Sequence, residues 1–339
     1  MEAGQFPADM LFDIFSRLPI KSLMRFRCVS PTWRSIIDDP CLACMHRLRC
    51  AEEPKVLILD PPTHEPADAT LREDGVFLKA SLNLLTRFAN SKAYSLRGCC
   101  NGLLCLTKQF CGESPLFLFN PPRQEVVELQ PPCIAPSRKK YGLGFDCSTN
   151  TYKIVGVFDD DLSAQVYTLG GAGSWRAISE GPPCPLLGRP VYSCGALHWV
   201  CGDDEGKIVC FDVGKEEFGL ISRPEFRSSH LLDLRGELAI VDRSSDKHVE
   251  IWVMKEYEKK EWVKEYKIGV KGVRGNEFVE VVGVCEHGEI LLKDVFENYF
   301  FYNPGTDMLK YSHIPSLNDE TQVLCHMGSL LSIAMFGAE

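Results

Sequence analysis

The stretch Phe6–Arg47 constrains the fold of this chain more than any other part of it. It carries several proline-punctuated helical patterns, with apolar residues recurring every three or four positions. A segment this small rarely buries enough apolar surface to be stable alone. We therefore expect a small helical module whose apolar face is completed by another protein. The remaining chain reads as a separate, β-rich body.

Proline and capping side chains divide this stretch into short helices. Pro7 suits the first position of a helix, where its missing N–H costs nothing, and Pro19 ends that helix. Ser30-Pro31 and Asp39-Pro40 each place a capping side chain before a helix-starting proline, so two further helices are predicted there. The apolar positions of the first three helices are Leu11, Ile14, Phe15 and Leu18, then Leu23 and Phe26, then Trp33, Ile36 and Ile37.

Charge distinguishes the N-terminal module from the body. The chain has 339 residues, of which 45% are hydrophobic and 24% charged, an ordinary globular balance. The net charge is -9, but residues 1–50 hold seven Lys/Arg against five Asp/Glu, so the remainder carries -11. An acidic body argues against binding to a nucleic-acid backbone. The slightly basic module would suit an acidic protein partner.

Sixteen cysteines and the start of the sequence together suggest a reducing compartment. A predicted amphipathic helix bearing Asp9 and Asp13 follows Met1–Gly4 directly, which is not the pattern of a secretory signal. Several cysteines lie inside apolar runs, where a reduced thiol behaves as a small hydrophobe: Cys105, Cys194, Cys201, Cys210 and Cys285. We expect free thiols, a location in the cytoplasm or the nucleus, and no membrane association, since no apolar run is long enough to cross a bilayer.

A fixed order of residues at fixed spacing runs through the helical stretch. It reads Ile14-Phe15-x-x-Leu18-Pro19, then Lys21-Ser22-Leu23-x-Arg25-x-Arg27-Cys28-Val29-Ser30, then Trp33. This order resembles the F-box, in the form typical of plant F-box proteins. Phe6 stands where Leu is usual and Pro31 where Lys is common. Both departures fit physically, the first as an apolar anchor and the second as a helix-starting proline.

The resemblance implies that residues 1–50 dock on a Skp-type adaptor, which links the chain to a cullin-RING ubiquitin ligase. Aromatic and aliphatic anchors dominate affinity at the centre of a protein interface. We predict the adaptor-binding residues to be Phe6, Pro7, Leu18, Pro19, Leu23, Cys28, Val29 and Trp33. Leu11, Ile14 and Ile36 are expected instead to hold the helices of the module together.

Residues 51–339 consist of short β-type runs separated by Gly, Pro, Asn and Asp, after a loop that extends to about Gly75. Five loosely similar units recur, beginning at Asn101, Tyr141, Gly195, Gly236 and Gly288. The last two spacings are 41 and 52 residues, which bracket the period of a four-stranded propeller blade. Such sheets bury both faces by stacking radially.

Leftover strands at both ends of this body, Val56–Leu59 and Ala80–Leu85 with Val323–Ile333, could complete a sixth blade. We therefore predict an α+β multi-domain chain, a small N-terminal helical module followed by an all-β propeller of about six blades. Five or seven blades, and a large β-sandwich, are the alternatives.

The body contains several further motifs at recognisable spacing. They are Gly98-Cys99-Cys100-Asn101-Gly102-Leu103, Phe119-Asn120-Pro121, Gly142-Leu143-Gly144-Phe145-Asp146 followed by Tyr152-Lys153-Ile154-Val155, Gly195-x-Leu197-His198-Trp199, and Ile251-Trp252-Val253-Met254. These motifs resemble the F-box-associated interaction domain of plant F-box proteins, which is kelch-like in architecture. In that family this domain selects the protein that is ubiquitinated.

Other residues that could carry chemistry favour structural roles. Cys41, Cys44, His46 and Cys50 have zinc-like spacing, but on a helix they fall on different faces. Asp159–Asp161 lacks the alternation of a calcium loop, and Gly170–Gly173 lacks the Lys and helix of a phosphate loop. His198 is expected in the core or at a blade edge, and Lys255–Lys264 in a solvated hairpin. We assign no catalytic residue, metal or cofactor.

The leading hypothesis is a non-catalytic substrate receptor of a Skp–cullin–F-box ubiquitin ligase, with a protein target whose identity and contact residues the sequence does not reveal. One alternative is a propeller enzyme of the kelch-oxidase kind, which would need Tyr and His ligands converging on the central channel. Another is an F-box scaffold that acts outside a ligase.

Overall fold

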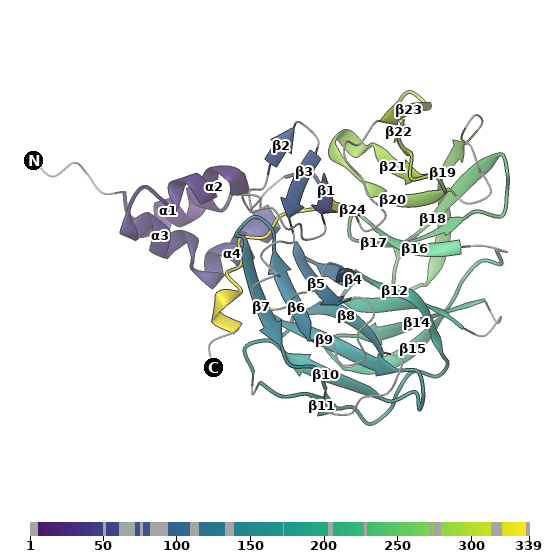
Figure 1. The fold of residues 1–339 in the computed structure, drawn as a ribbon, viewed down its shortest axis with the longest axis horizontal. Helices are drawn as coiled ribbons and strands as arrows, with labels where there is room; N and C mark the ends of the chain where they lie inside the picture. The colour runs from purple at the N-terminus through teal and green to yellow at the C-terminus, as the bar shows by residue number, and fades with distance from the viewer. Residues whose placement is uncertain are drawn as a thin grey trace, which may run out of the picture.

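The structure is a computed structural model that describes residues 6–49, 52–60, 72–74, 77–81, 94–108, 115–132, 139–171, 173–202, 206–226, 229–270, 273, 279–312 and 321–336. A helical module stands beside a ring of β-sheets (Figure 1). Its helices are α1 (Ala8–Phe15), α2 (Ile20–Phe26), α3 (Pro31–Ile37) and α4 (Pro40–Arg49). Within the described ranges, no helix combines the length and apolarity needed to cross a membrane.

Local signals explain where these helices begin. The predicted cap at Ser30 is confirmed, because its Oγ accepts a hydrogen bond from the Trp33 N–H at 3.1 Å and Pro31 occupies the first helical position. Pro7 is the N-cap of α1 rather than its first residue, and its carbonyl accepts from the Leu11 N–H at 3.2 Å. The helix therefore starts one residue later than predicted.

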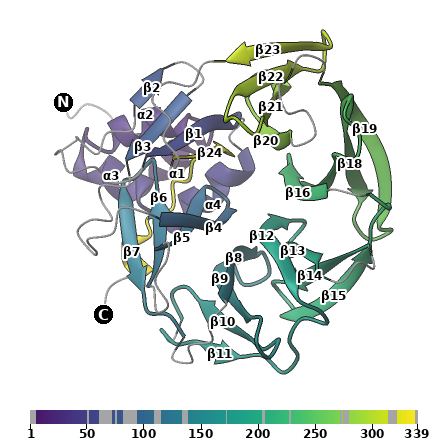
Figure 2. The ribbon, with the colours of Figure 1, turned by 45° about the vertical axis from the view of Figure 1, so that its right-hand side comes forward.

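The body is a six-bladed propeller of four-stranded sheets, as predicted (Figure 2). Blade 1 contains β4 (Tyr94–Cys100), β5 (Leu103–Lys108), β6 (Leu116–Asn120) and β7 (Glu125–Leu129); blade 2 contains β8 (Lys139–Asp146), β9 (Thr151–Phe158), β10 (Ala164–Thr168) and β11 (Arg176–Ala177). Blade 3 contains β12 (Leu186–Ser193), β13 (Ala196–Cys201), β14 (Lys207–Asp212) and β15 (Glu217–Ser222); blade 4 contains β16 (Ser229–Leu234), β17 (Glu237–Asp242), β18 (His248–Glu256) and β19 (Glu261–Gly269). Blade 5 contains β20 (Glu280–Val284), β21 (Ile290–Lys293), β22 (Tyr299–Asn303) and β23 (Met308–Ser312).

The sixth, closing blade joins strands from distant parts of the sequence. Its order is β2 (Arg72–Asp74), β3 (Phe77–Ser81), β1 (Lys55–Asp60) and β24 (Gln322–His326). β24 pairs with β1 antiparallel, whereas β3 pairs with β1 parallel. The predicted composition of this blade is confirmed for β1, β3 and β24; residues 82–85 of the predicted second strand lie outside the described residues. β24 also ends at His326, well before Ile333.

The first strands of blades 1 to 5, together with β24, surround the centre of the ring. The side chain of Gln322 on β24 closes the circle, because it accepts from the Leu96 N–H and donates to the Tyr94 carbonyl of β4, each at 2.8 Å. Every one of the six interfaces between neighbouring blades holds its own cluster of buried apolar side chains. Burial is therefore distributed around the whole ring, which distinguishes it from a two-layer sandwich.

The glycines that marked the repeat units lie at the turn after the inner strand. Asn101-Gly102, Cys194-Gly195 and Arg235-Gly236 have positive φ at both residues, as a type I′ hairpin turn requires. Most predicted units therefore began at the second strand of a blade, and the inner strands β12, β16 and β20 were missed. The unit beginning at Tyr141 differs, because Tyr141 lies within the inner strand β8.

A buried ion cluster secures the turn between β8 and β9. Lys153 Nζ lies 3.0 Å from Asp146 Oδ2 and 3.0 Å from Glu216 Oε1, and it donates to the Val213 carbonyl at 2.9 Å. Burial alone would raise the pKa of Asp146, but hydrogen bonds from Ser148 and Lys153 outweigh it and leave that pKa well below its usual value. The cluster joins blade 2 to the β14–β15 turn of blade 3.

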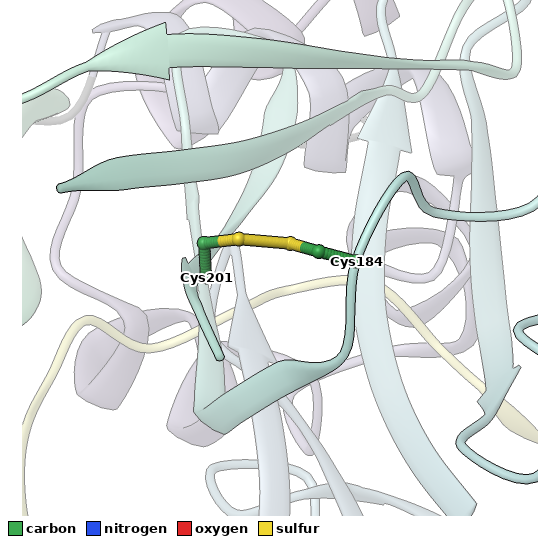
Figure 3. The surroundings of a disulfide bond; sticks show 2 residues. All are labelled: Cys184 and Cys201. Carbon is green, nitrogen blue, oxygen red and sulfur yellow. A yellow bond between two sulfur atoms is a disulfide. The ribbon is translucent and has the colours of Figure 1, made fainter. Parts of the chain in front are cut away.

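The expectation that all cysteines are free is wrong for one pair. Cys184 and Cys201 form a disulfide, with their Cα atoms 6.3 Å apart (Figure 3). Cys201 ends β13 and Cys184 precedes β12, and both side chains belong to the apolar cluster between blades 2 and 3. Composition could not reveal this pairing, because the antiparallel register of β12 and β13 brings the two segments together. Cys105 and Cys285 are free and buried, as expected.

We predict that Lys153→Met destabilises the protein by about 3–5 kcal/mol, because it leaves the buried Asp146 without its cation and Glu216 with only the largely exposed Arg176. The free energy of unfolding, measured by urea denaturation, tests this. The matched control is Lys215→Met, whose amino group is largely exposed and lies 3.9 Å from Asp212. The control should change stability by less than about 0.5 kcal/mol. Equal effects of the two substitutions would contradict the assigned role of the cluster.

We also predict that stability falls as the pH falls from 6.5 toward 4. Burial lowers the pKa of His198, His230 and His326 to about 4, and lowers that of His46. The unfolded chain, with an ordinary histidine pKa of 6.5, therefore binds more protons than the native one in this range, and acid favours unfolding. Asp233, whose pKa burial raises to about 6, acts in the opposite sense but is a single group.

Thermal unfolding at a series of pH values measures this dependence. His326→Asn should flatten the profile between pH 6.5 and 4, because it removes one buried imidazole. His287→Asn is the control, because that side chain is exposed and its left-handed backbone suits Asn. A melting temperature independent of pH over this range would refute the prediction.

Candidate functional site

The N-terminal helices enclose a compact apolar core of their own. Phe15, Phe26 and Trp33 pack with ring centroids 5.1 to 6.1 Å apart. The fully or nearly fully buried members of this core are Leu11, Phe15, Ile20, Leu23, Ile36, Ile37, Leu42 and Leu330. Leu330 does not belong to the helices, so the core is completed by a residue from the other end of the chain.

A second set of apolar side chains on the same helices is uncovered. Met10 and Ile14 lie four residues apart on α1 and are 50% and 42% exposed, and Phe6, just before the helix, is 61% exposed. Val29, in the turn between α2 and α3, is 62% exposed. An apolar face of this kind on a small module is typical of a protein-binding surface. We call Phe6, Met10, Ile14 and Val29 the open face.

The predicted adaptor-binding residues differ in their exposure in the structure. Phe6, Pro7, Pro19, Cys28 and Val29 are exposed and available to a partner.

Leu18 and Trp33 are half-buried and pack against the core of the module. Leu23 has no exposed surface, so its assignment to a partner contact is wrong in this arrangement; it holds α2 against the other helices. Ile14 was expected inside and is exposed, whereas Leu11 and Ile36 are buried as expected. Helical spacing defines an apolar stripe, but it does not say which neighbour covers which edge.

One buried arginine attaches the helices to the propeller. Arg123, in the β6–β7 turn, has a side chain only 2% exposed. Its Nη2 donates to Asp38 at the end of α3 at 2.7 Å, its Nε to Glu125 at 2.8 Å, and its Nη1 to the Leu330 carbonyl at 3.0 Å. Asp38 also accepts two hydrogen bonds from Arg27, at 2.7 and 2.9 Å. The guanidinium thus connects α3, blade 1 and the chain end.

The ionised state of Asp38 is stabilised by this arrangement. Burial alone would raise the pKa of its carboxyl group, but hydrogen bonds from Arg27 and Arg123 outweigh that effect and hold the pKa below its usual value. The attachment is therefore an ion pair under all ordinary conditions of pH.

The segment after β24 runs between the helices and blade 1 (Figure 1). Asn120 Nδ2 donates to the carbonyls of Ser329 and Leu331, at 3.2 and 2.7 Å, and fixes the segment on both sides of Leu330. Gly102 lies directly beneath it, where an added Cβ would come within 2.4 Å of the Met327 carbonyl. The glycine of this Asn-Gly turn in blade 1 therefore leaves room for the backbone of the segment after β24.

The other candidates from the sequence have structural surroundings. His46 is buried, with Nε2 2.8 Å from the Leu18 carbonyl, and Cys44 Sγ lies 3.7 Å from Asn150 Oδ1, so the two point to different partners; Cys50 lies outside the described residues. His198 is fully buried, as predicted, with Nε2 2.8 Å from the Tyr257 hydroxyl of blade 4. Across the described ranges, His, Cys, Asp and Glu side chains form no group of three placed to hold a metal ion.

The charged and glycine-rich stretches lie in turns. Asp159–Asp161 follows β9, where Asp159 pairs with Lys140 at 2.6 Å. Residues 170 and 171 follow β10 in a turn. The stretch Lys255–Lys264 is the exposed hairpin between β18 and β19, as expected.

Comparison with known proteins agrees with this architecture. The model of the F-box domain matches residues 4–44, and that of the F-box associated beta propeller domain matches residues 62–333. F-box protein At3g07870 of Arabidopsis thaliana is 29% identical, covering 96% of this chain and 91% of its own. F-box protein At5g65850 of the same plant is also 29% identical, covering 88% and 80%. F-box/kelch-repeat protein At3g23880 is 24% identical, covering 74% and 76%.

These matches define the class of protein: an F-box joined to an F-box associated β-propeller. The chain belongs to that family, since the propeller model alone matches most of its length. A solved structure, YCF48 bound to D1 peptide, has a TM-score of 0.41 at 9% identity over 66% of this chain and 68% of its own, a likeness too distant to bear on function.

We predict that Arg123→Met loosens the helices while the propeller stays folded. The substitution removes the cation shared by α3, Glu125 and the chain end, and should cost about 2–4 kcal/mol. Hydrogen exchange should accelerate in residues 6–49 and 329–333 and stay unchanged in blades 2 to 4.

The matched control is Arg34→Met. Arg34 pairs with the same Asp38, but at 3.7 Å and with its side chain 62% exposed. It should leave exchange in the helices nearly unaltered, since exposed pairs contribute little. Uniform acceleration throughout the propeller on Arg123→Met would show that Arg123 stabilises the ring itself rather than the attachment.

Proposed function

We propose that this protein is the substrate-recognition subunit of a Skp–cullin–F-box ubiquitin ligase. The open face docks on a Skp-type adaptor, the adaptor connects to a cullin-RING core, and the propeller binds the protein to be ubiquitinated. The receptor makes no covalent bond itself. It acts by raising the effective concentration of the target near the ubiquitin-charged enzyme. A location in the cytoplasm or nucleus is part of this proposal.

The observation that carries the proposal is the incomplete covering of the F-box helices. One side of the module is sealed by its own core and by Leu330, whereas Phe6, Met10, Ile14 and Val29 remain between 42% and 62% exposed. Had the propeller covered this face as well, an adaptor would have no apolar surface to bind. The covered side explains how the module is fixed to its own chain. The open face supports the proposal that the module also binds a second protein.

The target is proposed to bind the rim of the propeller that faces away from the helices. The turns at residues 101–102 and 121–124 meet the chain end and the helices. Because successive strands of a blade are antiparallel, loops between second and third strands emerge at the opposite rim. In blade 5 that loop carries Val295 and Phe296, which are 47% and 64% exposed. Exposed apolar groups on loops suit variable protein recognition.

We predict that Ile14→Asp and Val29→Asp each weaken adaptor binding by about 30-fold or more, because a charge placed in the desolvated centre of an interface removes a dominant anchor. Affinity of the purified full chain for a recombinant plant Skp-type adaptor is the measurement. Circular dichroism and the melting temperature of each variant establish that the propeller remains folded.

Met308→Asp on β23 is the matched control. Met308 is 67% exposed, so the substitution introduces the same charge at an equally exposed apolar position on blade 5. Adaptor affinity should be unchanged in this variant. Binding that survives both helical substitutions would refute the proposed interface, and co-purification of an adaptor without a cullin would favour a scaffold outside a ligase.

A further inference from the structure

A cavity of about 200 Å³ lies where the helices, the propeller and the chain end meet. α4 forms one wall, the β4–β5 and β8–β9 turns form a second, and residues 327–331 with 335–336 form the third. The propeller alone would not enclose this space, because two of its three walls are added by the F-box and by the segment after β24. It is separate from the open face.

The polar groups of this cavity that lack partners are hydrogen-bond donors. Arg47 reaches from α4 with its Cζ 4.0 Å from the centre of the Phe145 ring, and it has no carboxylate within ion-pair distance in the described part of the chain. A cation–π contact holds a guanidinium in place without neutralising its charge. Asn101 Nδ2 is buried and lacks a hydrogen bond of normal geometry, while its amide interacts with the Tyr152 hydroxyl in the same lining.

Two of the acceptors along the same walls are already in use. Glu52 Oε1, the one carboxylate of the lining, accepts from the Ile20 N–H at 2.9 Å. Asn150 Oδ1 faces Cys44 Sγ at 3.7 Å. A ligand that pairs with Arg47 and Asn101 must supply acceptors, and a buried donor left unpaired is costly.

Much of the remaining lining is apolar. Leu169, Leu330 and Phe336 lie around the cavity with Phe145, whose other role is to hold Arg47. The volume is below that of a drug-sized site and corresponds to about seven water molecules, given roughly 30 Å³ per water molecule. The volume, the donors and the apolar lining together favour a small ligand. Such a ligand has one ring or a short apolar chain and carries one anionic acceptor group.

We propose that this cavity binds a small amphipathic monocarboxylate, with the carboxylate on Arg47 and Asn101 and the apolar part against the chain end. Such a ligand contacts the F-box, blade 1 and the segment after β24 at once, so it stabilises their relative placement. The proposal does not rest on the proposed ligase function, because binding to the cavity is measured without adaptor or target.

Phenylacetate is the probe, and phenylacetamide, of the same size and shape but neutral, is its control. We expect saturable binding of phenylacetate to the purified full chain by calorimetry or ligand-observed NMR, and at least about tenfold weaker binding of the amide, because a charge-assisted hydrogen bond to Arg47 is lost. Inorganic phosphate as a third probe distinguishes a general anion site: phosphate binding as tightly as phenylacetate would overturn the role of the apolar walls.

Two variants locate the site. Arg47→Gln should weaken phenylacetate binding by about tenfold or more, and Arg47→Lys should restore part of it. Asn101→Gly removes the amide donor while tolerating the left-handed backbone, whose φ is 47°, and should also weaken binding. Arg49→Gln on the same helix is the control, since Arg49 pairs with Asp13 outside the cavity.

Three results would overturn the proposal. The first is equal affinity of the unaltered chain and Arg47→Gln for phenylacetate, with the melting temperatures showing that both are folded. The second is an equal affinity for phenylacetamide. The third is absence of saturable binding up to about 10 mM, the range in which a site worth even about 3 kcal/mol would be detected, which would identify the cavity as solvent-filled.

Discussion

The placement of the helices depends on a single guanidinium that is almost completely removed from water. A buried cation is tolerated only where its donors are satisfied, and Arg123 achieves this through Asp38, Glu125 and the Leu330 carbonyl. These three acceptors come from the F-box, from blade 1 and from the segment after β24. No two of them can move apart without leaving a buried charge unpaired, so one side chain determines how the F-box sits on the propeller.

The segment after β24 also links closure of the propeller ring to the packing of the helices. β24 pairs with β1, and the segment beyond it passes over the Asn101-Gly102 turn and places Leu330 among the helices. Closure of the propeller and completion of the F-box core thus depend on the same segment, although the F-box is the first element of the sequence. This explains how so short a helical module is stable on the chain while one of its faces stays apolar and exposed.

Sequence reasoning succeeded where the determining interactions are local or periodic. Ser30 caps α3 because its partner is three residues away, and the recurring glycines reveal the hairpin turns of the blades. It failed where a segment far away in the sequence determines the local structure or the burial of a residue. β12 reads poorly as a strand because it contains Gly188 and Pro190, yet neighbouring inner strands and β13 hold it in place. Likewise Leu23 was placed at a partner interface, because nothing in the spacing of α2 shows which helix covers it.

In the proposed ligase, the attachment of the F-box would affect any target held on the far rim. A flexible connection would let a target sample many distances from the ubiquitin-charged enzyme and would lower its effective concentration there. The ion pairs of Arg123 remove that freedom at one side of the joint, whereas the cavity beside Arg47 leaves the other side incompletely packed. Dense packing transmits displacement and a void absorbs it. The joint between F-box and propeller is therefore packed less densely at the cavity than at Arg123, and an occupant of that space would add contacts between the two parts.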